Sequence, residues 1–230
     1  MSTHYRNFPP PLEEIVASTD LERVGATGRG LYRSGLKRLF DLLLVIAAAP
    51  FIVPIVLMLA LIVARDGSNP FYFQDRIGKN GRVYRIWKLR SMVVDADSHL
   101  AAHLAASAEA RAEWTATQKL KADPRITSFG RFLRKSSLDE LPQLFNVLTG
   151  DMSLVGPRPM MCEQQALYPG TSYYDLRPGI TGYWQISDRN ETAFAERAFY
   201  DTRYAADLSF GTDVRILAKT VGVVMRGTGY

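Results

Sequence analysis

The sequence has almost no capacity for covalent cross-linking. Its 230 residues include one cysteine, Cys162, which excludes an internal disulfide. A reducing, cytosolic environment is therefore the simpler expectation. Internal repeats and long low-complexity runs are also lacking. The length suits one domain with a real core, or one domain with an appendage.

The familiar phosphate-binding loops are missing too. The segment 25–30 resembles a glycine loop, but no strand precedes it and no apolar helix follows it directly. It also lies too far into the chain to flank a secretory signal peptide. The segment 78–81 lacks the spacing and the Ser or Thr of a Walker loop. Neither segment is expected to cradle a nucleotide.

Positive charge is in excess. Lysine and arginine number 28 against 23 acidic residues, which gives a net charge of +5 and a pI near 9.3. Such a balance favours anionic partners, namely phosphates, nucleic acid or anionic lipid.

One apolar run dominates the first third of the chain. Residues 42–64 carry no charge and are numerous enough to cross a hydrocarbon core. Pro50 and Pro54 fall near the middle, and each removes a helical N–H donor. Cations flank both ends, so the positive-inside rule selects neither orientation. A re-entrant helix that turns at the prolines keeps every cation on one side; an ordinary kinked membrane helix is the alternative.

The rest of the chain mixes strands and helices. Alternating residues at 71–73 and 83–89 flank an Asn-Gly pair, which predicts a β-hairpin. A Pro-Gly turn at 178–179 leads into a further strand. Helices are expected at these places: 95–121, from Asp123-Pro124 as N-cap and first residue through Leu133, 191–206, and 213–226. His99 and His103 lie one helical turn apart, but without a third ligand a solvated helix face is favoured over a metal site.

Two adjacent carboxylates, Asp139 and Glu140, precede a short apolar helical stripe at 141–148. Pro142 is tolerated only in a first helical turn, so the helix should begin within about three residues upstream, with Asp139 at or beside the N-cap. Two interpretations follow. Ser137 and Glu140 fit a capping box, or Asp139 is a nucleophile at an anion-binding helix end.

Cations near this motif favour the second interpretation. Arg134 lies about one turn or loop upstream of Asp139. Arg158 stands between two prolines, which restrict the backbone and pre-aim the guanidinium. Lys88 and Arg90 belong to a basic cluster on the second hairpin strand. An acidic pair beside such groups is typical of a phosphate site, although solvent-exposed cations would give the same pattern.

At this point the ordered motifs resemble a known family, the bacterial sugar transferases that initiate glycan assembly, or monotopic polyprenyl-phosphate phosphoglycosyl transferases. The resemblance runs from about Lys37 to the C-terminus. It rests on these segments: 37–41, 74–78, 88–92, 133–143, 150–159, 177–182 and 189–190. The segment 113–125 and the Arg-Gly-Thr-Gly-Tyr end look like the rhizobial galactose-1-phosphate transferases of exopolysaccharide synthesis.

The resemblance implies that Asp139 and Glu140 form a catalytic pair that also holds Mg²⁺. It implies a UDP-sugar donor, undecaprenyl phosphate as acceptor, membrane lipid as a further partner and no nucleic acid. Phosphate or nucleotide contacts are expected from Lys88, Arg90, Arg134, Arg158, Arg177 and Arg189. The sugar and the oligomeric state, including a homo-oligomer, stay open. The implied location is the bacterial inner (cytoplasmic) membrane, with the catalytic domain on its cytoplasmic face.

The implied fold is α+β and mainly helical. A re-entrant membrane helix hairpin, broken at Pro50 and Pro54, joins amphipathic surface helices and a small β-hairpin or sheet around a cytosolic active site. The expected organisation is an N-terminal arm at 1–35, flexible or surface-bound, the re-entrant helix at 36–66 and a catalytic domain at 67–230, which is the short form of the family.

Two positions depart from the family pattern. Ala49 stands where members often have serine before Pro50, and Asp188 stands where glycine commonly precedes the Arg-Asn pair. The rival hypothesis is a membrane-anchored, non-catalytic scaffold of polysaccharide assembly.

Overall fold

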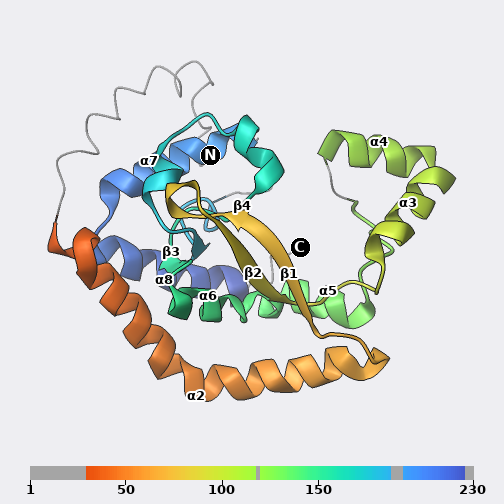
Figure 1. The fold of residues 1–230 in the computed structure, drawn as a ribbon, viewed down its shortest axis with the longest axis horizontal. Coiled ribbons are helices and arrows are strands. Elements are labelled where there is room, and N and C mark those ends of the chain that lie inside the picture. Colours follow the sequence, from red (N-terminus) through yellow and green to blue (C-terminus); the bar gives the residue numbers. More distant parts are fainter. Residues whose placement is uncertain (1–29, 118–119, 188–193, 226–230) are drawn as a thin grey trace, which may run out of the picture. The chain divides into compact units, whose positions relative to one another are not determined.

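The computed structural model describes residues 30–117, 120–187 and 194–225. Within them the chain is mainly helical, with small sheets (Figure 1). The chain divides into two compact units. Among the described residues, the first contains 30–48, 74–86, 143–187 and 194–223, and the second contains 49–73, 87–117, 120–142 and 224–225.

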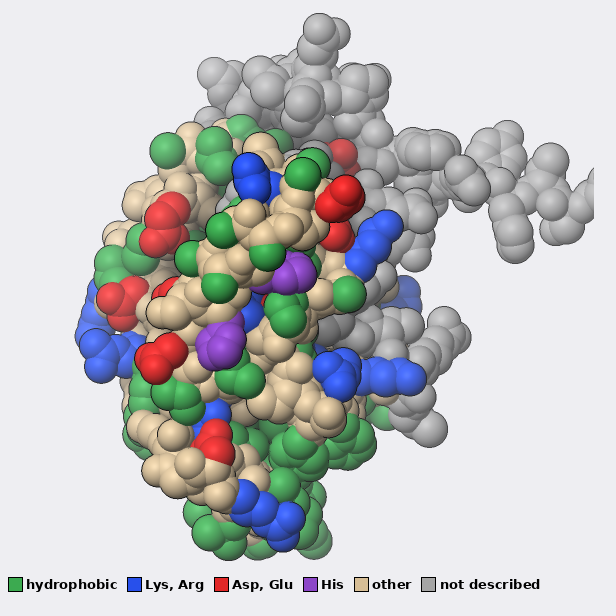
Figure 2. All heavy atoms as spheres, turned by 90° about the vertical axis from the view of Figure 1, so that its right-hand side faces the viewer, with side chains coloured by type: hydrophobic (Ala, Val, Ile, Leu, Met, Phe, Trp, Pro, Cys, Tyr) green, Lys and Arg blue, Asp and Glu red, His purple; other side chains and the backbone are tan. Residues whose placement is uncertain are grey.

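The apolar run forms one long helix, α2 (Lys37–Val63), after a π-helical turn η2 (Tyr32–Leu36) and before a short 3-10 turn η3 (Ala64–Asp66). It is long and apolar enough to cross a membrane. Many of its large side chains face outward, Ile46, Phe51 and Leu61 being 60%, 74% and 73% exposed. Figure 2 shows hydrophobic side chains gathered at the lower end of the view, over α2. Exposed apolar surface on this scale marks a membrane or protein contact.

Pro50 and Pro54 both lie inside α2, whose helical assignment continues through them. A proline inside a helix still frees the carbonyl four residues earlier and favours a kink. The re-entrant turn itself therefore stays a prediction.

The predicted hairpin is confirmed. Strands β1 (Phe71–Ile77) and β2 (Val83–Leu89) belong to a sheet of order β2-β1-β4, with β4 at Met160–Met161. The turn between them, η4 (Lys79–Gly81), holds Asn80 and Gly81 at positive φ values of 58° and 73°. Two successive left-handed residues match the twist of a tight hairpin, which explains the Asn-Gly pair.

The rest of the first unit packs around a parallel pair of short strands, β3 (Ser153–Val155) and β5 (Gly179–Thr181). Gly156 and Gly179 let the two backbones touch, because a Cβ at Gly179 would lie 2.1 Å from Gly156 N. Helices α6 (Gln143–Thr149), α7 (Arg197–Asp207) and α8 (Phe210–Met225) complete the unit, with short 3-10 turns η6 (Cys162–Leu167), η7 (Ser172–Asp175) and η8 (Phe194–Glu196). The strand after the Pro-Gly turn and the two C-terminal helices are thus confirmed.

The second unit departs from the prediction twice. The expected single helix at 95–121 is two helices, α3 (Ala96–Ala106) and α4 (Ala108–Thr117), because Ser107 takes an extended conformation and its Oγ caps Ala110 N. Asp123-Pro124 does not start the next helix either. Thr127 caps α5 (Ser128–Lys135) through Gly130 N, while the Asp123 carboxylate pairs with Arg125 at 2.7 Å.

A small core holds this second unit together. Leu59, Ala60, Leu89 and Leu133 are buried, and Val63, Phe71, Phe129 and Leu138 pack against them. The end of α2, the end of β2 and α5 thus meet at one apolar cluster. Leu138 attaches the Asp139-Glu140 turn to it.

Candidate active site

The two carboxylates lie in a 3-10 turn, η5 (Leu138–Glu140), and not at the start of a helix. The α-helix that follows, α6, begins at Gln143 and has seven residues. Ser137 adopts a left-handed φ of 55° and its side chain caps nothing. The capping box and the N-cap position expected for Asp139 are therefore wrong, while anion binding near this turn stays a prediction.

Asp139 is buried without a partner. It is 8% exposed, and within the described part of the chain no hydrogen bond or ion pair joins its carboxylate to another residue. The pKa of Asp139 is raised to about 6, and burial is the main cause; the charge of Lys88 lowers this pKa, that of Glu140 raises it and that of Arg134 lowers it. At pH 7 the group is still mostly ionised, and a buried carboxylate that no other described residue bonds is costly enough to suggest a functional purpose.

Lys88, near the end of β2, reaches the same turn. Its Nζ donates to Glu140 Oε1 at 2.7 Å, with both side chains about three-quarters buried. The ion pair joins residues 52 positions apart. This ion pair holds Glu140 in position. It also places the positive charge of Lys88 near Asp139, although Lys88 forms no ion pair with Asp139.

Arg134 supplies a second positive charge. Its Nε donates to Ser91 Oγ at 2.8 Å. Burial lowers the pKa of Arg134, and the charge of Asp139 acts in the opposite direction. Gly130 makes this placement possible, because a Cβ there would lie 1.9 Å from Ser91 O. Helix α5 therefore docks with its backbone on Ser91. Ser91 is a site residue that the sequence did not single out, since only this packing reveals its role.

Arg90 bonds to groups of the protein itself, and its predicted phosphate contact stays a prediction. Its Nε donates to Asn69 O at 2.9 Å and its Nη2 to Asp66 Oδ1 at 2.7 Å. Further bonds reach the carbonyls of Val63 and Met92. These contacts close the end of α2, so the observed role of Arg90 is structural.

Two other predicted cations, Arg158 and Arg177, belong to the first unit. Arg158 lies over the Trp184 ring at 5.1 Å, and Arg197, which the sequence did not indicate, lies over the same ring at 4.4 Å. Burial lowers the pKa of Arg197 to about 10. Arg177 donates from Nε to Gly150 O at 2.8 Å. Arg189 lies outside the described residues.

The carboxylate pair is chemically suited to magnesium. Mg²⁺ in phosphate-transfer sites is held by one or two carboxylates together with substrate phosphates, not by a cage of protein ligands. Asp139 and Glu140 provide that minimal set, and no group of three acidic, histidine or cysteine residues occurs among the residues that the structure describes. His99 and His103 share α3 without a third ligand.

Comparison with known proteins agrees with the motifs. Residues 32–227 match the family model described as bacterial sugar transferase. The chain is 45% identical over 196 residues to the undecaprenyl-phosphate galactose phosphotransferase of Salmonella typhimurium and 44% identical over 196 residues to the UDP-galactose-lipid carrier transferase of Erwinia amylovora. These alignments cover 84% of this chain and 41% of each relative, so the chain spans about two fifths of their length. It is 42% identical to the exopolysaccharide production protein ExoY of Rhizobium meliloti, over 84% of this chain and 87% of ExoY.

Proposed function

The chain belongs to the bacterial sugar transferase family, and from that premise we propose that it transfers a sugar-1-phosphate from a UDP-sugar to undecaprenyl phosphate. UMP is released, and the product is the first lipid-linked sugar of an exopolysaccharide or another surface glycan. The names of the relatives support UDP-galactose as the type of donor and undecaprenyl phosphate as the acceptor. The observation that carries the proposal is the buried carboxylate of Asp139, which no other residue in the described part of the chain bonds and which lies near the charges of Lys88 and Arg134.

In the first step, an oxygen of Asp139 attacks the phosphorus that bears the sugar. A phosphorus–oxygen bond to the aspartate forms, the bond to the bridging oxygen breaks, and UMP leaves with the electron pair. In the second step, a phosphate oxygen of undecaprenyl phosphate attacks the same phosphorus. The bond to Asp139 breaks, the carboxylate is regenerated, and the sugar diphospholipid forms. A covalent intermediate divides one difficult transfer into two easier ones.

The residues of the site fit these steps. Asp139 has a pKa near 6, so it is available as an anionic nucleophile at neutral pH. The charges of Lys88 and Arg134 stabilise the negative charge that builds on the transferring phosphoryl group. Lys88 also holds Glu140 in place through their ion pair.

Magnesium would be held by Asp139 and Glu140 together with the diphosphate of the donor. When bound, it would neutralise charge on that diphosphate and orient it.

The membrane helix brings the lipid acceptor to the enzyme. Helix α2 is apolar and exposed enough for the bilayer. We propose that it is re-entrant at Pro50 and Pro54, in the bacterial inner membrane, and that the carboxylate site lies on the cytoplasmic face where the phosphate of undecaprenyl phosphate resides. A cysteine introduced at Pro10 in a Cys162→Ser background tests this topology. Labelling from the periplasm by a membrane-impermeant reagent would refute the re-entrant arrangement.

The transfer itself is tested by measuring UMP release. Purified full-length protein is incubated with Mg²⁺, undecaprenyl phosphate and a panel of UDP-sugars that includes UDP-galactose and UDP-glucose. One sugar should give rapid UMP release. Donor labelled in the sugar phosphate, with acceptor omitted, should label the protein at Asp139.

Asp139→Asn should abolish both turnover and the labelled adduct. Asp97→Asn, which changes an exposed acid of α3, is the matched control and should retain both. Full turnover in Asp139→Asn would remove the nucleophile from the mechanism. No UMP release by the unaltered protein from any UDP-sugar would favour the non-catalytic scaffold.

A further inference from the structure

A cleft of about 320 Å³ opens within the first unit beside the start of α2. Polar side chains line it from η2 and α2, from the β1–β2 turn and from the loop before β5. Its charged lining consists of Arg33, Lys37, Arg38, Lys79 and Arg177, with the acids Asp41 and Asp175. Asp139, Glu140, Lys88 and Arg134 are not part of it. The cleft is therefore a second concentration of positive charge, made of other residues.

Two of its arginines are held firmly by the end of α6. Arg38 donates to the carbonyls of Val147 and Leu148, and Arg177 donates from Nε to Gly150 O. These carbonyls belong to the last turn of α6 and the residue after it, where helical acceptors are left over for side-chain donors; Val147 O also accepts from Gly150 N. Within the described residues, the Nη groups of Arg177 donate to nothing else. Its guanidinium is thus oriented while two of its nitrogens remain available to a ligand.

The positive charge in the cleft is only partly compensated. Lys37 is neutralised by Asp213 at 2.7 Å, and Asp41 is occupied by Ser153 Oγ at 2.7 Å. The guanidinium groups of Arg38 and Arg177 are close enough to repel each other. Lys79 is exposed and forms no ion pair with any residue that the structure describes. Like charges brought together around a hollow favour the binding of an anion.

The position of the cleft residue Arg38 at the start of α2 indicates which kind of anion the cleft binds. Arg38 precedes the outward-facing Leu43 and Ile46, which are 58% and 60% exposed, by five and eight residues. At 1.5 Å per residue this separation is roughly 8 to 12 Å. The polar layer of a bilayer is about 5 to 7 Å deep on each side of the hydrocarbon. With the apolar part of α2 in lipid, this separation places the cleft at the outer edge of the headgroup layer, within reach of the headgroup phosphates.

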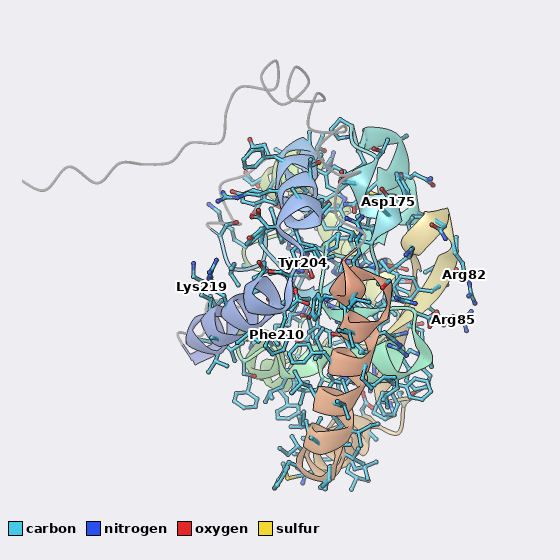
Figure 3. All side chains as sticks on the ribbon, turned by 90° about the vertical axis from the view of Figure 1, so that its left-hand side faces the viewer. Arg82, Arg85, Asp175, Tyr204, Phe210 and Lys219 are labelled. Carbon is cyan, nitrogen blue, oxygen red and sulfur yellow. The ribbon has the colours of Figure 1, made fainter. Side chains whose placement is uncertain are left out.

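Figure 3 views the molecule from the side on which α2 begins, with Tyr204 and Asp175, both of which line the cleft, near the middle of the view. Arg82 and Lys219 lie toward opposite edges of the same view and do not line the cleft. They are cations of the same unit that serve for comparison.

We propose that this cleft binds the phosphate of an anionic membrane phospholipid and anchors the base of α2 at the membrane surface. The ligand is a phosphate diester at the headgroup level, held by the spare donors of Arg177 and by Lys79. This site is additional to the transfer reaction and does not depend on it.

The test is a titration of the full-length protein, in a zwitterionic detergent, with short-chain phosphatidylglycerol, followed by calorimetry. Lys79→Gln should weaken binding about fivefold, as expected for one cation near a phosphate. Arg82→Gln removes the same charge three residues away, outside the cleft, and should leave the affinity unchanged. Equal affinities for the two variants would overturn the proposal.

Two further titrations distinguish the sources of phosphate. Short-chain phosphatidylcholine should bind at least about fivefold more weakly than phosphatidylglycerol, because the net positive cleft favours a net negative headgroup. Inorganic phosphate and UMP should not displace the lipid at comparable concentrations. If UMP displaced it and bound more weakly to Lys79→Gln, the cleft would be a nucleotide site and the lipid proposal would be wrong. UMP release by the unaltered protein is measured separately, so a failure here leaves the transferase proposal standing.

Discussion

Two buried aspartates, one in each unit, differ in how their charge is satisfied. Asp213 is fully buried and accepts hydrogen bonds at 2.7 Å from Tyr32 Oη, Lys37 Nζ and Tyr204 Oη. Asp139 is almost as buried, but no described residue bonds its carboxylate. Burial of a charge is tolerated when partners replace its water. Asp213 meets that condition and stabilises the base of α2, while the oxygens of Asp139 are bonded by no other described residue and are available to a ligand.

The arginines of the second unit show the same contrast. Arg90 donates hydrogen bonds to backbone carbonyls and pairs with Asp66 at the end of α2. Arg134 makes one side-chain bond, to Ser91, and otherwise lies under the influence of Asp139. In these two pairs, the fully bonded side chain stabilises the frame and the incompletely bonded one belongs to the candidate site. Each prediction below tests that distinction.

The largest expected effect is on catalysis at Asp139. Asp139→Asn should lower the rate of UMP release by at least about 10³-fold, because the nucleophile is lost. It should also stabilise the fold at pH 7. The pKa of Asp139 is raised to about 6 in the folded state, above its usual value of 3.8, so stability falls as pH rises between those values. Removing the charge should recover free energy of unfolding on the order of 3 kcal/mol at pH 7. Chemical denaturation at pH 7 and pH 4 measures this, and an equal gain at both would contradict it.

Asp213→Asn should act in the opposite direction. Losing the charge leaves Lys37 buried without its anion and should lower the free energy of unfolding by about 3 kcal/mol. Denaturant unfolding of this variant beside Asp97→Asn gives the comparison. An Asp213→Asn protein as stable as the Asp97→Asn control would show that the network at the base of α2 carries no stability.

The pH dependence of the reaction should follow the protonation of the Asp139 carboxylate. Since protonation removes the nucleophile, kcat/KM for the UDP-sugar should fall about tenfold per unit as pH drops below about 6. Steady-state rates between pH 5 and 8, in buffers of constant ionic strength, measure the profile. A flat profile down to pH 5 would place the working pKa well below 6 and contradict the effect of burial.

The smallest effect separates the two arginines. Arg90→Gln should lower the free energy of unfolding by about 1 to 2 kcal/mol, because carbonyls at the end of α2 lose their donor. Arg134→Gln should raise the KM for the UDP-sugar more than Arg90→Gln does. The free energy of unfolding and the KM are measured on both variants. A larger increase in KM for Arg90→Gln than for Arg134→Gln would show that Arg90 contacts the substrate.

Local patterns predicted the elements whose cause is local. The Asn-Gly turn, the apolar helix and the amphipathic stretch of α5 were all correct, because backbone conformation and period alone define them. The helix start at Asp123 and the cap at Ser137 were wrong. In the first case the Asp123 carboxylate pairs with Arg125, whose guanidinium lies over Trp114. In the second, Leu138 packs into the core and holds the turn in a 3-10 form. Both outcomes depend on contacts that a local pattern does not contain.

The sequence by itself determined the ingredients of the site. These are the adjacent carboxylates, the basic residues in ordered motifs and an uncharged run long enough for a membrane. Only the tertiary structure decided which charged side chains are paired within the protein and which keep atoms available to a ligand. The reason is distance along the chain: Lys88 meets Glu140 across 52 residues, and Tyr32 meets Asp213 across 181. The partner of a charged side chain is set by the packing of remote segments, so Asp139 stands apart from Asp213 only in the folded molecule.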